Sequence, residues 1–300
     1  MKVLRLAVAA CLTLSVAASA QEPQPIRRRE APRAYAAVEV PAAAVEVPML
    51  DGPLAVVEVR IDGQGPFRFG IDTGAAGGGR IDQKVVEKLK LPVAGQAMAG
   101  DPSGKNRRSV DIIRIGKLSV GEAVFRDVNA TAGDYSDLGI DGILGVGLFS
   151  EHLLTLDYPR RKVRIERGEL PPADGRRILG FEAQRGVPTI RLRVGEVEVD
   201  AHIDSGNTRS EIVVPASLAG QLKLAAEPVS IGTARTGFNQ FEVRQAPLAG
   251  TLVLGSYELP NPKIDIVDLF PHANLGHKFL QRFAVTLDGK GRRIRFEPAS

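Results

Sequence analysis

Two short motifs hold the residue types that could do acid–base chemistry. An aspartate, a small hydroxyl residue and a glycine occur in this order as Asp72-Thr73-Gly74 and again, 132 positions later, as Asp204-Ser205-Gly206. Two carboxyl groups a few ångströms apart do not both ionise readily, so such a pair holds one proton over a wide pH range. The ionised member can take a proton from water while the protonated member hydrogen-bonds a carbonyl oxygen. The motifs together could therefore support hydrolysis without a metal ion, a cofactor or a covalent intermediate.

The residues around the aspartates fit supporting roles in this chemistry. Gly74 and Gly206 let the backbone approach closely, and their amides can donate hydrogen bonds to carboxylate oxygens. Each motif alone is also an ordinary turn, because Asp, Ser, Thr and Gly are the usual turn-forming residues. The apolar Ile71 and Ile203 directly before the aspartates favour buried strands instead. Because the two titrations would be coupled, the sequence leaves open which aspartate carries the proton.

The motifs are embedded in an internal repeat. Segments 143–145, 148–149, 154–157 and 162–165 of the first half are answered, 131 positions later, by 275–276, 279–280, 285–288 and 293–296. A three-residue match alone arises by chance, whereas matching order and spacing along two halves of a chain is much stronger evidence. The repeat therefore predicts two related lobes that each contribute one aspartate to a single site.

Buried strands are expected to position both aspartates. Each half contains two apolar-rich segments around a glycine-containing turn, namely 54–61 with 66–71 and 187–194 with 196–203. Short helices are expected over 82–89 and near 216–222. Each aspartate then occupies a loop between a buried strand and the next element, where an exposed side chain rests on rigid support.

The composition favours β structure. The 300-residue chain is 44% hydrophobic and 25% charged, which suffices for one large core or two small ones. It contains 32 glycines and 20 prolines but only 5% aromatic residues, a balance that suits many short strands and turns better than a helical bundle. The sequence predicts a mainly β fold with few short helices.

Residues 1–20 have the pattern of a secretory signal peptide. Lys2 and Arg5 precede the apolar run 6–16, and Ala18-Ser19-Ala20 supplies a small-residue cleavage site. The apolar run is too short for a stable membrane span. Cys11, the only cysteine, lies inside it, so the processed chain would have no thiol, unless this cysteine is the lipid attachment site of a lipoprotein. We expect an exported protein, periplasmic or secreted.

Residues 21–48 are rich in proline and alanine and predict a leader or linker, with the alternative of a strand that docks onto the body of the protein or covers its site.

The charge argues against nucleic acid as a partner. The full chain has 39 basic and 35 acidic residues, and removal of the signal peptide takes away Lys2 and Arg5 but no acid. The remaining basic runs are scattered among acids, as in solvated turns.

Residues 50–300 resemble the retropepsin-like and pepsin-like aspartic peptidases, particularly bacterial two-lobed members. The resemblance is carried by Ile-Asp-Thr-Gly-Ala at 71–75, Ile-Asp-Ser-Gly at 203–206, Gly-Ile-Leu-Gly at 142–145 and, more weakly, Asn-Leu-Gly at 274–276. It implies two β-barrel-like lobes with a cleft between them. The N-terminal lobe would cover 49–168 and the C-terminal lobe 178–300, with 169–177 connecting them.

The resemblance also implies an activity and a set of site residues. Asp72 and Asp204 would form one catalytic dyad that activates water to cleave peptide or protein substrates. The hydroxyls of Thr73 and Ser205 would brace the two loops against each other. The segments Ile143-Leu144-Gly145 and Leu275-Gly276 would support the aspartates. The dyad would be intramolecular, so a monomer would suffice, although a homodimer with one acid from each chain is a further option.

The sequence departs from the family pattern at three places. The hairpin expected to cover the substrate, 96–108, has no tyrosine at its tip. Phe238 and Phe241 in the corresponding stretch of the second half could cover the cleft instead, or be partly buried hairpin residues. Asn274 stands where an aliphatic residue is usual, and Asn207 replaces the usual Thr or Ser after the second motif. These departures leave open a second function, that of a weakly active or inactive peptide-binding protein.

Other site chemistries find no motif in the sequence. The four histidines show no paired ligand spacing and no His-Glu-x-x-His run, which argues against a metal site. His202 would point to the same side of its strand as Asp204, with an electrostatic role or simple packing as the alternatives. A phosphate-binding loop and a Gly-x-Ser-x-Gly frame around Ser205 are both missing.

Overall fold

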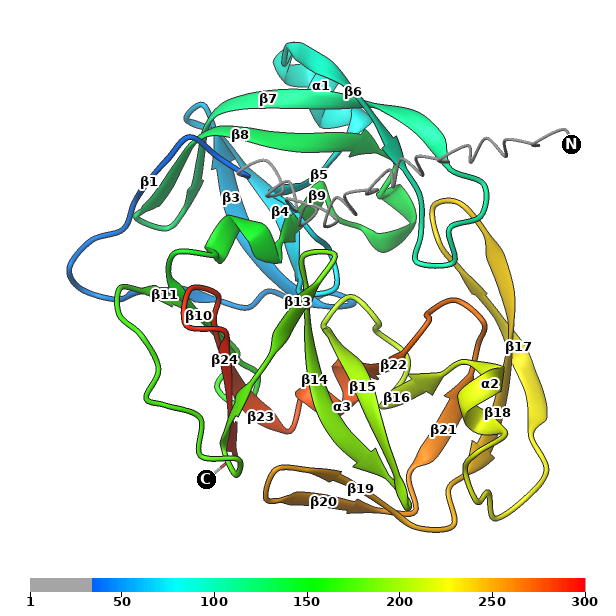
Figure 1. The fold of residues 1–300 in the computed structure, drawn as a ribbon. Coiled ribbons are helices and arrows are strands. Elements are labelled where there is room, and N and C mark those ends of the chain that lie inside the picture. Colours follow the sequence, from blue (N-terminus) through cyan, green and yellow to red (C-terminus); the bar gives the residue numbers. More distant parts are fainter. Residues whose placement is uncertain (1–33, 300) are drawn as a thin grey trace, which may run out of the picture. The chain divides into compact units, whose positions relative to one another are not determined.

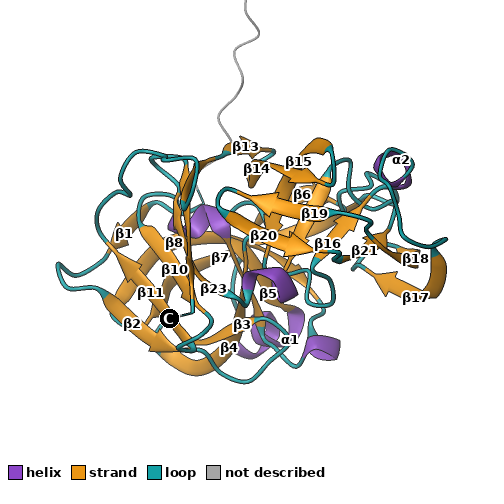
Figure 2. Cartoon of the chain, turned by 90° about the horizontal axis from the view of Figure 1, so that it is seen from below, coloured by secondary structure: helices purple, strands orange, loops and turns teal. Residues whose placement is uncertain are grey.

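The computed structural model describes residues 34–299 (Figure 1). The expected signal peptide with Cys11, and the first part of the expected leader, lie outside the described residues. Helices in the described part are short and few beside the strands (Figure 2). The prediction of a mainly β fold is confirmed.

The first lobe is a closed barrel. Hydrogen bonding runs in the order β8-β5-β9-β4-β3-β7, and β7 then pairs with β8 to close the ring. The apolar side of each strand faces inward, as in β3, where Val57, Val59 and Ile61 are buried and Glu58 is exposed. The strands are β3 (Ala55–Ile61), β4 (Gln64–Asp72), β5 (Gly79–Asp82), β6 (Val93–Ala99), β7 (Arg108–Val120), β8 (Ala123–Gly133) and β9 (Gly142–Gly145).

Local sequence explains two of these connections. Asp62 and Gly63 both have positive φ and form the turn that connects β3 to β4, as the Asp-Gly dipeptide predicts. Helix α1 (Gln83–Leu89) begins after Asp82, whose carboxylate caps the amide of Lys84 at 2.8 Å. The other Asp82 oxygen accepts from the amide of Tyr135 at 2.8 Å, which ties the helix start to the segment before β9.

The second lobe repeats this topology. The parallel pairs β4–β9 and β5–β8 of the first lobe correspond to β15–β22 and β16–β21. The long strands β7 and β8 each correspond to two shorter strands in the second lobe. For example, β18 and β19 together make the pairings that β7 makes alone. The elements are β13 (Glu182–Gln184), β14 (Val187–Val194), β15 (Val197–Asp204), β16 (Ile212–Val214), α2 (Ala216–Ala219), β17 (Val229–Arg235), β18 (Gln240–Pro247), β19 (Thr251–Leu254), β20 (Tyr257–Pro260), β21 (Lys263–Ile266) and β22 (Ala273–Gly276).

A third sheet joins the two lobes. Its strand order is β12-β24-β23-β10-β11-β2, so three strands from the second half of the chain continue without a break into three strands from the first half. At its centre β10 and β23 pair antiparallel, with Thr155 opposite Thr286. The strands are β2 (Val45–Pro48), β10 (Leu153–Asp157), β11 (Lys162–Glu166), β12 (Ile178–Gly180), β23 (Phe283–Asp288) and β24 (Arg293–Pro298). The remaining elements are β1 (Ala37–Glu39), the 3-10 turns Ser136–Leu138 and Val146–Phe149, and α3 (His277–Leu280).

The segment before the first lobe is docked rather than free. β1 pairs with β8 at the barrel, and β2 extends the joining sheet by pairing with β11. Of the alternatives for 21–48, docking as strands therefore describes its second part, from residue 37 onward. These strands lie against the body of the fold at two separate edges.

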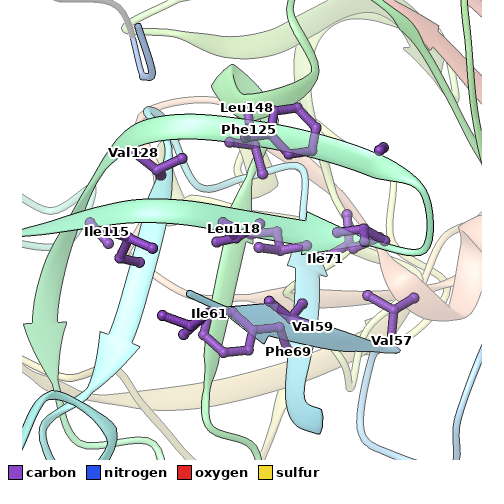
Figure 3. Close-up of a cluster of buried hydrophobic side chains, with 14 of the residues drawn as sticks. Val57, Val59, Ile61, Phe69, Ile71, Ile115, Leu118, Phe125, Val128 and Leu148 are labelled. Atoms are coloured by element: carbon purple, nitrogen blue, oxygen red, sulfur yellow. The ribbon is translucent and has the colours of Figure 1, made fainter. Parts of the chain in front are cut away.

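Each lobe has its own apolar core. In the first, buried side chains from β3, β4, β7 and β8 fill the barrel, among them Phe69, Ile71, Ile115 and Phe125 (Figure 3). In the second, the equivalent layer includes Ile203 and Leu275. Ile71 and Ile203, which directly precede the aspartates, are fully buried. The strands that carry the aspartates are therefore anchored in the two cores.

The buried threonine pair of the joining sheet offers a test of how the lobes are held. The hydroxyls of Thr155 and Thr286 are 2.9 Å apart, and Thr286 has a second, weaker partner in Arg295 at 3.4 Å. Thr286→Val strands the hydroxyl of Thr155 in the core, so we expect it to lower the free energy of unfolding by about 1–2 kcal/mol. Thr155→Val should cost less, and the double variant less than the sum of both. Denaturant unfolding measures this, and strictly additive losses would contradict it.

Candidate active site

The two aspartates occupy equivalent positions at the ends of paired strands. Asp72 ends β4 and lies beside Gly145 of the parallel strand β9. Asp204 ends β15 and lies beside Gly276 of β22 in the same register. The apolar-apolar-Gly segments that the resemblance assigned as supports therefore run directly next to the aspartates. Because both pairs are parallel, the carboxyl end of β9 lies beside Asp72 and that of β22 lies beside Asp204.

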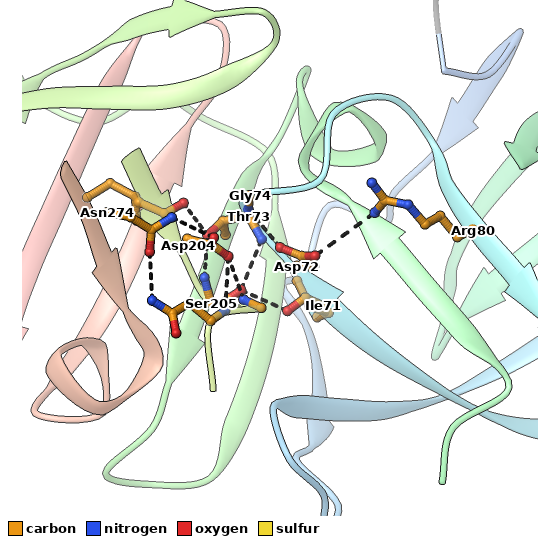
Figure 4. Close-up of polar contacts among 11 residues, drawn as sticks. Ile71, Asp72, Thr73, Gly74, Arg80, Asp204, Ser205 and Asn274 are labelled. Atoms are coloured by element: carbon orange, nitrogen blue, oxygen red, sulfur yellow. Dashed lines mark hydrogen bonds and ion pairs between the residues drawn. The ribbon is translucent and has the colours of Figure 1, made fainter. Parts of the chain in front are cut away.

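Four hydrogen bonds brace the two loops against each other (Figure 4). The Thr73 hydroxyl donates to the carbonyl of Ile203 at 2.7 Å and accepts from the amide of Ser205 at 3.0 Å. The Ser205 hydroxyl donates to the carbonyl of Ile71 at 2.8 Å and accepts from the amide of Thr73 at 3.0 Å. Both hydroxyl residues are fully buried. Each lobe thus satisfies the buried polar groups of the other.

The glycines let the carboxyl groups cross to the opposite loop. The amide of Gly74 donates to Oδ1 of Asp72 at 2.8 Å, and that of Gly206 to Oδ1 of Asp204 at 2.9 Å. A Cβ atom on Gly74 would lie 2.5 Å from the carboxyl carbon of Asp204, and one on Gly206 would lie 2.5 Å from that of Asp72. Each glycine is therefore packed under the other lobe's carboxyl group, and a side chain at either position would push the pair apart.

The two carboxyl groups share a hydrogen bond and perturb each other's ionisation. Burial raises the pKa of Asp72 to about 7, together with repulsion from the Asp204 carboxylate. Burial also raises the pKa of Asp204, but hydrogen bonds to this carboxylate oppose the shift. The sequence had left the proton unassigned, and the structure favours Asp72 as its holder.

The asymmetry comes from the partners of the two carboxylates. Asp204 accepts from the amide of Gly206, from that of Asn207 at 3.1 Å and from Nδ2 of Asn274 at 2.7 Å. Asp72 accepts only from Gly74 among the hydrogen bonds found in the described residues, and its Oδ2 lies 4.0 Å from Nη1 of Arg80. Figure 4 places Asn274 and Arg80 on opposite sides of the pair.

Sequence reasoning assigned no role at the aspartates to three of these neighbours. Asn274 and Asn207 stood out only as departures from a family pattern, although their positions beside and just after the second motif put them in reach of Asp204. Arg80 belongs to no motif. It reaches Asp72 because β5 pairs with β9, which in turn pairs with β4, a neighbourhood that spacing along the chain does not reveal.

The hairpins of the two lobes meet at their tips, which lie side by side in Figure 1. Oδ2 of Asp101 accepts from the Thr236 hydroxyl at 2.6 Å and from Nδ2 of Asn239 at 2.7 Å. Nδ2 of Asn106 donates to Oδ1 of Asn239 at 2.6 Å. We call this contact between residues 101–108 and 236–239 the tip clasp. Both candidate covering hairpins are therefore joined to each other.

Of the two aromatic residues of the second hairpin, Phe238 takes part in the tip clasp and Phe241 lies outside it. The guanidinium of Arg108 lies 4.8 Å from the centroid of the Phe238 ring, and its Nη2 donates to the carbonyl of Gly237 at 3.2 Å. Phe241 lies in β18, where its side chain is half-buried. Burial opposes ionisation of Asp101, but hydrogen bonds from Ser103, Thr236 and Asn239 outweigh it and hold its pKa below the ordinary value.

The His202 side chain packs against two neighbouring rings. Its ring makes edge contacts with His272 and Phe270, at centroid distances of 5.6 and 6.3 Å, and burial lowers its pKa. Among residues 34–299 no cluster of histidine, cysteine or acidic side chains has an arrangement that could hold a metal ion. In the same part of the chain, no helix is long and apolar enough to cross a membrane.

The raised pKa of Asp72 predicts how stability depends on pH. The folded protein keeps the Asp72 proton up to about pH 7, whereas an unfolded aspartate releases it near 3.8. The folded state thus binds more protons in this window, and its stability falls as the pH rises through it. Asp72→Asn should remove this loss, making the variant more stable than the parent by about 1 kcal/mol or more at pH 8 and similar at pH 3. Thermal unfolding across pH measures the difference, and parallel curves would refute it.

Comparison with protein families supports the resemblance to aspartic peptidases. Residues 57–148 match the family model described as aspartyl protease. The match contains Asp72, its Thr73-Gly74 continuation and the supporting segment 143–145, while the second motif lies beyond it. Comparison with curated proteins found no match. The resemblance of this chain to the retropepsin-like aspartic peptidases is thereby confirmed.

Proposed function

We propose that the protein is an aspartic endopeptidase in which Asp72 and Asp204 hydrolyse peptide bonds by activating one water molecule between them. The observation that carries this proposal is the contact of the two carboxyl groups at equivalent ends of β4 and β15. Two carboxyl groups that share a hydrogen bond are close enough to hold one water by direct hydrogen bonds. The braced loops keep this geometry in place before any substrate arrives.

The reaction needs one ionised and one protonated carboxyl group. The ionised group takes a proton from water as the oxygen attacks the peptide carbonyl. The protonated group donates a hydrogen bond to the carbonyl oxygen, where negative charge develops. The proton taken from water then passes to the peptide nitrogen as the C–N bond breaks. A carboxylic acid and an amine leave, and the pair returns to its singly protonated state. The hydrogen bonds around the dyad favour Asp204 as the base and Asp72 as the acid.

The substrate would be an extended peptide that lies between the dyad loops and the tip clasp. Five hydrogen bonds join the two tips across the lobes, and we propose that the tips part to admit the substrate. One chain supplies both aspartates, so we propose a monomeric enzyme. The signal-like pattern of residues 1–20 supports a periplasmic or secreted location.

Substitution of either aspartate tests the dyad directly. Asp72→Asn and Asp204→Asn keep the size of the side chain but remove the acid or the base, so each should lower kcat/KM by at least about a hundredfold. Activity of the unmodified protein should decline above about pH 7, as Asp72 loses its proton. Cleavage of a diverse peptide library by the purified mature protein, followed from acidic to neutral pH, measures both effects.

Asp137→Asn is the matched control, because Asp137 is an exposed acid in a 3-10 turn. It should cleave as the parent does. Full activity in either dyad variant would end the dyad hypothesis. Peptide binding by the parent protein without cleavage at any pH would favour the alternative, a peptide-binding protein with the same fold.

The tip clasp makes a prediction about motion. All three hydrogen bonds found for the Asn239 side chain cross to the first-lobe tip, at Asp101, Lys105 and Asn106. Asn239→Ala should therefore accelerate amide hydrogen exchange at residues 101–106 by about tenfold, although the substitution lies in the other lobe. Gln240→Ala, at the exposed neighbouring position, is the control. Unchanged exchange at 101–106 would show that these bonds do not hold the tips together.

A further inference from the structure

The repeat lets each residue of one lobe be compared with its counterpart in the other. Asn274 in β22 occupies the position of Ile143 in β9, because each directly precedes the Leu-Gly that runs beside an aspartate. Asn207 occupies the position of Ala75, three residues after the aspartate. The first lobe thus has an apolar pair where the second lobe has two asparagines.

The two pairs have different surroundings. Ala75 and Ile143 belong to a small apolar cluster with Leu54, Val56 and Ile140. In the second lobe, Nδ2 of Asn207 donates to Oδ1 of Asn274 at 2.8 Å. Nδ2 of Asn274 in turn donates to Oδ2 of Asp204 at 2.7 Å. Asn274 is fully buried.

This chain of hydrogen bonds has one direction. The oxygen of the Asn274 amide is occupied by Asn207, so its nitrogen must face Asp204. A buried amide nitrogen needs an acceptor, and an ionised carboxylate is the strongest one available. Protonation of Asp204 at this oxygen would set two donors against each other. The arrangement therefore favours the ionised form of Asp204.

Within residues 34–299, no side chain donates a comparable hydrogen bond to Asp72. The side chain nearest to its Oδ2 among the described ion pairs is that of Arg80, at 4.0 Å, which is too far for a hydrogen bond. Arg80 is 35% exposed, so solvent screens its charge. We propose that Asn274, oriented by Asn207, is a positioning residue that holds Asp204 as the ionised member of the dyad and leaves the proton on Asp72. Its part in catalysis rests on the proposed function, whereas the assignment of the proton does not.

The proposal predicts which step of the dyad's titration depends on Asn274. The first proton to leave comes from Asp204, and its loss creates the charge that Asn274 stabilises. The second leaves from Asp72, while Asn274 is bonded to Asp204 both before and after. Loss of the amide should therefore raise the lower apparent pKa of the pair by about one unit and leave the upper one nearly unchanged.

The test replaces the polar pair with the residues of the other lobe. Asn274→Ile combined with Asn207→Ala installs the pair that the first lobe already accommodates at the equivalent place. The carboxyl carbon of Asp204 is followed by NMR through a pH titration of the folded protein, which requires no activity. In parallel, the pH profile of kcat/KM is measured, where the acidic limb should move upward and the basic limb should stay. Ile143→Val, at the equivalent position of the first lobe, should move neither limb of the pH profile.

Each outcome bears on the proposal separately from the proposed function. An Asp204 titration that stays where it is in the variant, or an equal shift of both limbs, would overturn the role of Asn274. A lower thermal stability with unchanged titration would mean that Asn274 is structural only. A shifted titration in a protein that cleaves no peptide at any pH would support the assignment of the proton and contradict the peptidase function.

Discussion

The contact between two buried carboxyl groups is the constraint on which the rest of the structure depends. Like charges at this distance repel strongly, so the fold must prevent the loops from separating and must keep a proton in the pair. The hydroxyls of Thr73 and Ser205 do the first, because each is buried and finds its partners only in the other lobe. The glycines admit the opposing carboxyl group at a distance that any side chain would prevent. Burial at this short separation then raises the pKa of Asp72, which keeps a proton in the pair.

Residues at equivalent positions of the repeat also contact each other in the joining sheet. Thr155 and Thr286 are repeat equivalents, and they face each other in the centre of the joining sheet, as Thr73 and Ser205 face each other in the loops. Residues that correspond in the two halves thus contact each other at two levels along the boundary between the lobes. The third contact, the tip clasp, lacks this symmetry, since Asp101 accepts from two second-lobe side chains. A contact at the tips can differ between the lobes because its residues lie outside both apolar cores.

Features set by short-range pattern were accessible from the sequence, and features set by cross-lobe packing were not. The strands before the aspartates and the turn at Asp62-Gly63 followed from apolar runs and turn chemistry, and the repeat predicted two related lobes. The clasp could not be predicted, because which tip residues meet depends on how two separately folded hairpins lie in space. Arg80 was missed for a similar reason, since two strand pairings intervene between it and Asp72.

A symmetric fold creates a difficulty for acid–base catalysis, because two identical carboxyl groups have no reason to divide the roles of acid and base. In a symmetric pair the proton is shared, and binding of a substrate must choose the direction. Here the two lobes differ where the side chains approach the aspartates, with Ala75 and Ile143 on one side and Asn207 and Asn274 on the other. Because the backbone pairing is the same in both lobes, only side-chain chemistry breaks the symmetry. Under the proposed function, two related but unequal lobes allow one carboxyl group to hold the proton before the substrate binds, which two identical chains related by symmetry do not.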